Sequence, residues 1–288
     1  GVEAIAAVSV FFPIIFCLMA FVIGLSAGST VLVGQAWGAQ NVEKVRCIVG
    51  STLFMTLIGG SLIACLGVIY AKQILILLGT DPKVMHLSLP YVQWMLAGSP
   101  LLFVYIIYTS ILRGVGDSLT PLIALSLTSL MGLVITPILI AGYFGFPRLG
   151  IIAPAIATIL GYLAVLIFLV IYLNKKNHPL KMDRHLLRQI RHQPNLSKVI
   201  LRLGIPTGLQ MVTTSMAGLV IVGLVNRHGA EATAAYGAVN QVLNYIQFPA
   251  LSIAIAASIF AAQAIGAGKA ELLAKVSRTA LGMNLLIT

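Results

Sequence analysis

Seven long apolar stretches run through the chain, and their length is what most restricts its fold. They cover residues 7–33, 47–71, 89–112, 119–143, 150–173, 199–225 and 235–263. A helix needs about 20 apolar residues to cross the roughly 30 Å hydrocarbon core of a bilayer, so each stretch is long enough to span it. Runs such as AVLIFLVIYL lack the apolar–polar alternation of barrel strands. The sequence therefore predicts an all-α membrane protein, a polytopic helical bundle with seven full transmembrane helices and part of an eighth.

The composition agrees with lipid as the solvent and argues against several classes of function. Only 9% of the residues are charged, against about 25% in soluble domains. The net charge of +11 lies between apolar runs and not on one compact face, so binding to nucleic acid is not expected. The three cysteines and five histidines lack the spacing of a metal site or a disulfide framework. No catalytic motif and no Walker-type phosphate loop is present, so we expect neither an enzyme nor a cofactor.

The distribution of Lys and Arg predicts which connections face the cytoplasm. Fourteen of these eighteen residues lie on one side of the predicted helices and four on the other. Cytoplasmic connections collect Lys and Arg. The connections near residues 40, 115, 185 and 270 are therefore predicted to be cytoplasmic, in a multi-pass protein of a bacterial-type inner membrane.

A shift of 228 residues aligns the chain with itself without a gap. It aligns polar residues as well as apolar ones, in the pairs Glu3 and Glu231, Gln35 and Gln263, Gly38 and Gly266, and Glu43 and Glu271. Apolar composition alone does not explain aligned Glu and Gln residues, so we infer an internal duplication. One period contains six crossings, an even number, so the two halves point the same way, as in the parallel repeats of some transporters.

The period also predicts how the chain is organised. Two periods make about 456 residues and twelve helices in two parallel six-helix repeats. Since the chain begins without Met and stops within an apolar run, we expect a fragment that lacks the first helix and most of the last four. The predicted parts are an amino-terminal lobe at 1–173, a cytoplasmic linker at 174–198 and the start of a carboxy-terminal lobe at 199–288. Leu186, Leu187 and Ile190 predict either a short basic helix on the inner membrane surface or a solvated connection.

Three motifs together resemble the multidrug and toxic compound extrusion (MATE) family of transporters. They are GLSAGSTVLVGQAWGAQN at 24–41, LRGVGDSLTP at 112–121 and NRHGAEATAAYGAVNQ at 226–241. The resemblance covers nearly the whole chain. It implies two six-helix lobes around a central cavity, in agreement with the repeat.

Gln35 and Gln263 occupy corresponding cytoplasmic helix ends, each followed three residues later by a glycine. We expect Gly38 and Gly266 to permit a tight turn or a helix C-cap. The two amides are expected to cap that turn or to bond to the opposite lobe, in preference to binding substrate. Gly24 and Gly28 lie earlier on the same predicted helix, where small residues allow close helix contact.

The segment at 112–121 has the pattern of a helix end, a sharp turn and a new helix start. Arg113 lies at the end of the first helix, Gly116 in the turn, and Pro121 near the start of the next helix. Asp117 or Ser118 is available as the N-cap. We predict a structural role, or a latch that forms when the cytoplasmic side closes, in preference to transport chemistry.

Polar residues at membrane depth predict the face of a cavity, because contact with lipid disfavours them. The main substrate-cavity candidates share one helical stripe and are Tyr236, Asn240, Asn244 and Gln247. The alternative is that they form hydrogen bonds between helices. Gln210 and Thr214, just beyond Pro206, are further candidates because a kink there would free backbone carbonyls.

The coupling chemistry is where the sequence departs from the resemblance. All seven acidic residues are predicted in loops or at helix ends. Cation-coupled export usually needs an intramembrane carboxylate, whose raised pKa or negative charge exchanges a proton or holds sodium. Thr136 and Thr214 stand where family members carry acidic residues. Thr158 matches a threonine near the family's cation site, or is satisfied by a carbonyl one turn back.

The resemblance and the repeat favour a secondary active exporter whose two lobes rock around a central cavity. We expect amphipathic substrates, with cationic drugs or metabolites favoured, exchanged for protons or sodium. The expected partners are the lipid bilayer and a small-molecule substrate, with no obligate protein partner. The alternatives are a flippase of lipid-linked sugars with a related fold, or a membrane receptor or scaffold that does not transport.

Overall fold

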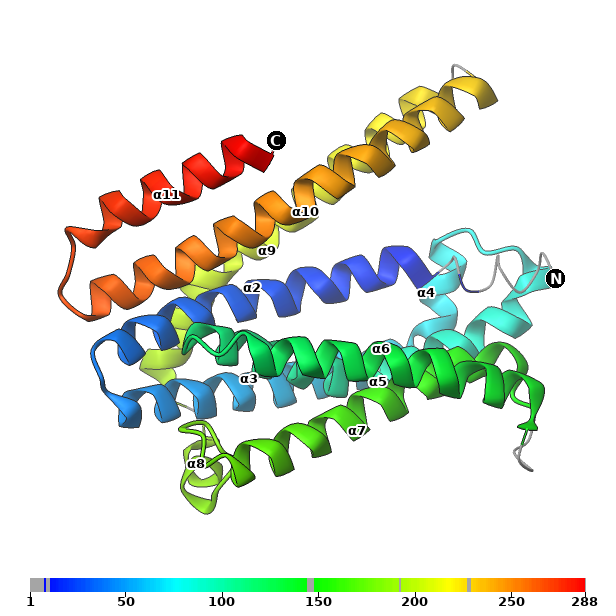
Figure 1. The fold of residues 1–288 in the computed structure, drawn as a ribbon. Helices are drawn as coiled ribbons and strands as arrows, with labels where there is room; N and C mark the ends of the chain where they lie inside the picture. Colours follow the sequence, from blue (N-terminus) through cyan, green and yellow to red (C-terminus); the bar gives the residue numbers. More distant parts are fainter. Residues whose placement is uncertain (1–7, 9–10, 144–147, 192, 227–228, 288) are drawn as a thin grey trace.

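The computed structural model describes residues 8, 11–143, 148–191, 193–226 and 229–287 (Figure 1). Its long helices are α2 (Phe11–Gly38), α3 (Val42–Ile69), α5 (Pro82–Gly114), α6 (Leu119–Ala141), α7 (Ala153–Lys175), α9 (Pro194–Asn226) and α10 (Ala230–Gly266). Short helices are α4 (Ala71–Leu77), η2 (Gly150–Ile152), α8 (Arg184–Gln189) and α11 (Leu272–Ile287). Among the described residues, seven helices are long and apolar enough to cross a membrane. The predicted all-α membrane fold with seven full crossings is confirmed.

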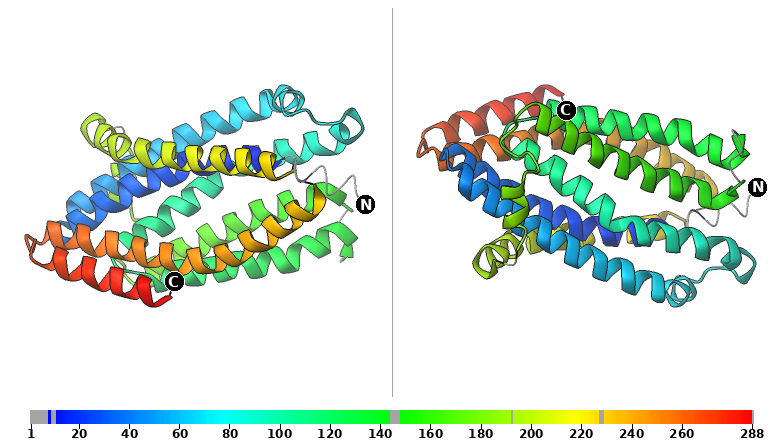
Figure 2. Two further views of the ribbon diagram at one scale, coloured as in Figure 1. Left: turned by 90° about the horizontal axis from the view of Figure 1, so that it is seen from above. Right: turned by 90° about the horizontal axis from the view of Figure 1, so that it is seen from below.

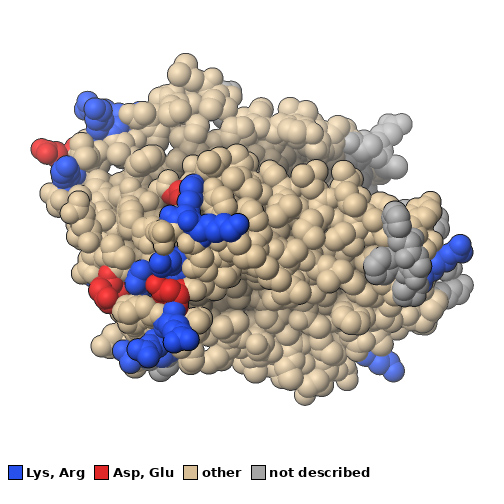
Figure 3. Space-filling view, turned by 60° about the horizontal axis from the view of Figure 1, so that its bottom comes forward, with Lys and Arg blue, Asp and Glu red and all other residues tan. Residues whose placement is uncertain are grey.

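The connections predicted to be cytoplasmic all lie at one end of the bundle. These are the α2–α3, α5–α6, α7–α9 and α10–α11 connections, on the left in Figure 1. Most of the charged side chains visible in Figure 3 gather at this end, whereas the middle of the face seen there carries almost no charge. We call this end the basic end. Its place on the cytoplasmic side of the membrane stays a prediction from the excess of Lys and Arg.

The amino-terminal part of the chain has a large hydrophobic core and a small second cluster at Leu139, Ala153 and Ala157. Helices α2, α3, α5 and α7 contribute to the large core, and α6 packs on α7. Its largest fully buried side chains include Phe103 and Tyr108 of α5 and Leu169 and Leu173 of α7. Because these side chains bury their apolar surface against one another, they stabilise the packing of these helices around α2.

The connection between α7 and α9 packs against the basic end of this core. The Tyr108 hydroxyl donates to the carbonyl of Leu180 at 2.5 Å, and Arg46 forms an ion pair with Asp183 at 3.7 Å. Leu186 of α8 is fully buried in the core. A short basic helix therefore forms, with Leu186 in the core and Leu187 exposed, so the connection is not merely solvated. Its position at the inner membrane surface stays a prediction.

Asp183 also fixes the start of α8. Its carboxylate accepts a hydrogen bond from the Leu186 backbone N–H at 2.8 Å, which is an N-cap. This bond favours the ionised form and lowers the pKa of the Asp183 carboxyl below its usual range. The linker boundaries at 174 and 198 stay a prediction, although α7 continues to Lys175 and α9 already begins at Pro194.

Helix α9 follows this connection and packs mainly along α2 of the preceding lobe (Figure 2). Helix α10 also packs on α2, and α11 packs on α10. In Figure 1, α9 and α10 diverge from α2 toward the end opposite the basic end. The contacts between the first five long helices and the last two are therefore concentrated along α2.

Candidate functional site

Helices α2 and α9 cross in backbone contact at glycines. A Cβ atom on Gly24 would lie 2.7 Å from the carbonyl oxygen of Gly204, and one on Gly28 would lie 2.5 Å from that of Ile200. Real Cβ atoms essentially never approach so closely, so only glycine fits at this separation. Gly24 and Gly28, and Gly204 and Gly208, form a GxxxG pair on each helix. The close contact predicted for Gly24 and Gly28 is confirmed, and the matching pair on α9 is the signal that identifies their partner.

Helices α2 and α10 meet in a second backbone contact, at the basic end. A Cβ atom on Gly38 would overlap the carbonyl oxygen of Gln263, and one on Gly266 would overlap the carbonyl oxygen of Gln35. The shift of 228 residues exchanges these two contacts. The internal duplication therefore appears in the structure as a reciprocal contact between corresponding residues of the two halves.

The expected role of Gly38 and Gly266 in a turn or C-cap is wrong. Neither glycine has a positive φ, and each is the last residue of its helix. The left-handed positions lie two residues later, at Gln40 with φ 56° and Gly268 with φ 71°. The glycines are needed for the approach of the two helices, not for the direction of the chain. Sequence alone did not separate these reasons because both require a small residue near a helix end.

The side chain of Gln263 connects α10 to the end of α5. Its Nε2 donates a hydrogen bond to the carbonyl oxygen of Gly114 at 2.9 Å. The last carbonyls of a helix lack partners within that helix, so this bond caps α5 from a segment 149 residues away. Of the two roles expected for the amide, bonding to the opposite lobe is the one observed.

The turn after α5 has the predicted form. Gly116 has φ 91°, in the left-handed region that favours glycine. Asp117 accepts hydrogen bonds from the backbone N–H of Thr120 at 3.0 Å and from its hydroxyl at 2.5 Å. Asp117, and not Ser118, therefore provides the capping side chain of α6. Pro121 is the third residue of α6 and is buried.

Arg113 and Asp117 contribute further contacts at the same end. The Arg113 guanidinium donates to the Ser110 hydroxyl at 2.6 Å. Asp117 lies 3.7 Å from Nε2 of His178 in the connection to α9. Burial lowers the pKa of the His178 imidazole, an effect that the nearby Asp117 carboxylate partly opposes. These contacts support the structural role predicted for the segment.

The polar stripe lies on α10 as predicted, and its side chains form no hydrogen bond to any other helix that the structure describes. Tyr236 and Asn240 are half-buried, whereas Asn244 and Gln247 are exposed. The Asn240 amide donates to the carbonyl of Tyr236 at 3.0 Å, within its own helix. Among the described residues the stripe makes no hydrogen bond to another helix, so its role as a cavity face stays the prediction.

The remaining candidates bond within their own helices. Gln210 and Thr214 of α9 are exposed, and the Thr214 hydroxyl donates to the Gln210 carbonyl at 2.9 Å. The Thr158 hydroxyl donates to the Pro154 carbonyl at 2.7 Å, which is the alternative that the sequence left open.

The acidic side chains that the structure describes lie in connections or at helix ends: Glu43, Asp81, Asp117, Asp183 and Glu271. Glu3 and the side chain of Glu231 lie outside the described residues. A coupling carboxylate at membrane depth is therefore not found in the described part of the chain, in agreement with the sequence.

Replacing Gln263 with glutamate tests the bond to α5. Glutamate has nearly the same size but no N–H, so it would bring a carboxylate against the Gly114 carbonyl. We expect the basic end to open, seen as faster labelling by a membrane-impermeant maleimide of a cysteine introduced at the buried position Val115 in inside-out vesicles, with the three native cysteines replaced. Gln263→Ala removes one hydrogen bond, worth about 1 kcal/mol, and should act in the same direction more weakly. Labelling unchanged in both variants would contradict this role.

Comparison with known proteins places the chain among membrane transporters. The MatE family model matches residues 1–138 and 206–288. The probable multidrug resistance protein YoeA of Bacillus subtilis is 43% identical over 100% of this chain and 62% of its own length. An FAD transporter of Shewanella oneidensis is 28% identical over 94% of this chain and 59% of its own length.

Solved structures show the same architecture. A crystal structure of MATE in complex with MaD3S aligns with a TM-score of 0.89 and 26% identity, over 100% of this chain and 64% of that one. A multidrug resistance MATE family transporter in an outward-facing conformation aligns with a TM-score of 0.88 and 25% identity, over 100% and 62%. The chain thus spans less than two thirds of the length of these proteins.

Proposed function

Because the chain belongs to the MatE family, we propose that the full-length protein, at the length of its relatives, is a secondary active exporter. It expels amphipathic compounds, with cationic drugs or metabolites favoured, in exchange for protons or sodium. The multidrug resistance relatives support this assignment. The alternative functions drawn from the sequence, a flippase or a receptor, have no specific observation in their favour.

The observation that carries the proposal is the reciprocal contact at the basic end. Helices α2 and α10 touch there through Gly38 and Gly266, and they diverge toward the opposite end (Figure 1). This arrangement is closed on the predicted cytoplasmic side. Export by rocking requires that the contact between Gly38 and the Gln263 carbonyl, and its counterpart, form and break once in each cycle.

A whole-cell efflux assay tests the proposal. Cells that lack their own pumps and express the full-length protein are expected to accumulate several-fold less ethidium than cells with an empty vector. Collapse of the proton gradient, or removal of sodium, should abolish the difference and name the coupling ion. Equal accumulation in both strains, with the protein present in the membrane, would refute the proposed export of cationic compounds.

The polar stripe of α10 is expected to contribute to the same activity. Replacing Asn240 and Asn244 together with leucine should lower ethidium efflux about tenfold, because two polar groups leave the proposed substrate path. The control is Val242→Leu, an exposed position on the other side of α10. If both variants pump like the wild type, the stripe does not line the path, although export itself would stand.

A further inference from the structure

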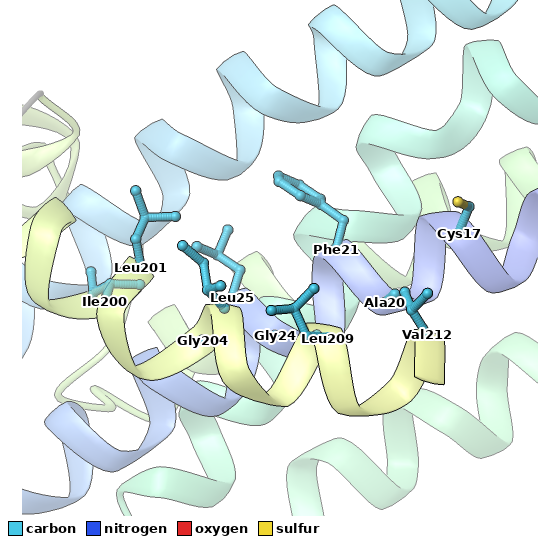
Figure 4. Close-up of a pocket in the computed structure, with 12 residues that line it drawn as sticks. Cys17, Ala20, Phe21, Gly24, Leu25, Ile200, Leu201, Gly204, Leu209 and Val212 are labelled. Atoms are coloured by element: carbon cyan, nitrogen blue, oxygen red, sulfur yellow. The ribbon is translucent and has the colours of Figure 1, made fainter. Parts of the chain in front are cut away.

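An apolar groove lies beside the crossing of α2 and α9 and is separate from the polar stripe of α10 (Figure 4). It encloses about 310 Å³. Its walls include Phe21 and Leu25 of α2 and Leu201, Ile205, Leu209 and Val212 of α9. Figure 4 shows Phe21, Leu25 and Leu201 projecting to the same side of the crossing, with the Gly24–Gly204 contact as the floor.

The length of the groove along α9 is close to the thickness of one leaflet of a bilayer. From Leu201 to Val212 is eleven residues, or about 16 Å at 1.5 Å per residue. Half of a roughly 30 Å hydrocarbon core is about 15 Å. On α9 the groove lies in the half of the helix nearer the basic end, whereas on α2 it extends from Leu25 past the middle of the helix to Cys17. The groove therefore runs from the side of the basic end to the middle of the bundle. Within the described part of the chain, Leu209 is 61% exposed and Ile205 54%.

Two cations lie where this groove meets the basic end. Successive members of one series on α9 are three or four residues apart, which places them on one helical face. The series is Lys198, Arg202, Ile205, Leu209 and Val212. Both cations are exposed. In the described part of the chain, neither Lys198 nor Arg202 has a carboxylate within 4.0 Å. Their charges remain available to an anion at the headgroup level.

We propose that the groove binds an anionic phospholipid of the cytoplasmic leaflet. Lys198 and Arg202 hold its phosphate, and one acyl chain lies along Leu201, Ile205 and Leu209 against Phe21. The lining offers almost no polar surface, so an extended peptide would leave its backbone N–H and C=O groups unsatisfied there, whereas a hydrocarbon chain needs no partner. The lipid packs over the α2–α9 glycine crossing and stabilises it.

Lipid retention tests this site. The purified full-length protein is exchanged into detergent containing either phosphatidylglycerol or phosphatidylcholine, and bound lipid is counted by native mass spectrometry. We expect the wild type to retain phosphatidylglycerol preferentially. The double variant Lys198→Gln, Arg202→Gln should bind it about thirty-fold more weakly, because each cation near the surface contributes about 1 kcal/mol. The variant Lys198→Arg, Arg202→Lys should retain it.

Two controls separate the site from general attraction of anionic lipid to a basic protein. Lys175→Gln with Lys176→Gln removes two cations from the end of α7, away from the groove, and should leave retention unchanged. Ile205→Trp fills the groove without changing charge and should displace the lipid. The proposal is overturned if Lys198→Gln, Arg202→Gln retains the lipid, if Lys175→Gln, Lys176→Gln loses it equally, or if Ile205→Trp binds it as the wild type does.

Discussion

Alanine at Gly38 or at Gly266 is expected to reduce drug efflux by the full-length protein to the level of an empty vector. A Cβ atom at either position would overlap a carbonyl oxygen of the other helix, where ordinary contact begins near 3.4 Å. The atoms that the Cβ would meet belong to the backbone and cannot rotate away as a side chain could. Helices α2 and α10 would therefore have to separate by more than about 1 Å. The basic end then cannot close, and a transporter that cannot close on one side leaks or stalls.

The measurement is ethidium efflux together with cytoplasmic labelling of a cysteine introduced at Val115, which is buried at this end. We expect efflux to disappear and labelling to rise in both variants, with normal amounts of protein in the membrane. The control is Gly161→Ala in α7, where a Cβ atom would be in ordinary contact with Thr128 at 3.8 Å. Because the two contacts are equivalent under the repeat, Gly38→Ala and Gly266→Ala should have similar effects. Full efflux in either would show that the contact is not part of the cycle.

Alanine at Gly28 or at Gly204 is expected to destabilise the folded protein itself. A Cβ atom on Gly28 would lie 2.5 Å from the Ile200 carbonyl oxygen, and one on Gly204 would overlap that of Gly24. Overpacking of a well-packed contact costs about 1–3 kcal/mol. Alanine favours the helix over glycine by about 1 kcal/mol. In each variant the net loss in the free energy of unfolding is therefore smaller than the cost of the clash. With both substitutions, we expect the midpoint of thermal unfolding in detergent to fall by several degrees.

Gly223→Ala in the same helix is the matched control. Its Cβ atom would meet nothing within 4 Å, so only the gain in helix propensity remains and stability should stay the same or rise slightly. The same methyl group thus has opposite effects at two positions of α9. A fall in the unfolding midpoint at Gly223 as large as that at Gly204 would show that glycine matters here for helix flexibility and not for the crossing.

Much of the fold is predictable because it depends on local composition. Seven apolar stretches each exceed the length that a bilayer requires, so the number of crossings follows without any knowledge of their packing. The asymmetry of Lys and Arg predicts the orientation in the same way. The duplication is visible because Gln35 and Gln263 remain aligned, and the turn at Gly116 and Asp117 is predictable because a cap needs residues only a few positions apart.

The candidate site needed more than local patterns. The stripe from Tyr236 to Gln247 is evident from its helical period, yet the period alone does not say whether the side chains meet another helix or a cavity. For Gln263, the sequence left two partners open, and the structure selects the Gly114 carbonyl. The helical period of the polar residues is a property of one helix, whereas a hydrogen-bond partner lies on another helix, which the period does not identify.

The sequence by itself therefore determined the helices and the relation between the two halves, and its charges predict which side of the membrane each connection faces. Only the tertiary structure showed why particular helix positions are glycine. Gly38 and Gly266 each pack against a backbone carbonyl of the opposite half, and Gly24 packs against the backbone of Gly204. The tertiary structure also decided that Leu186 is buried in the core of the amino-terminal lobe. The physical reason is that hydrophobicity and capping act within a few residues, whereas close packing depends on which surfaces distant segments bring together.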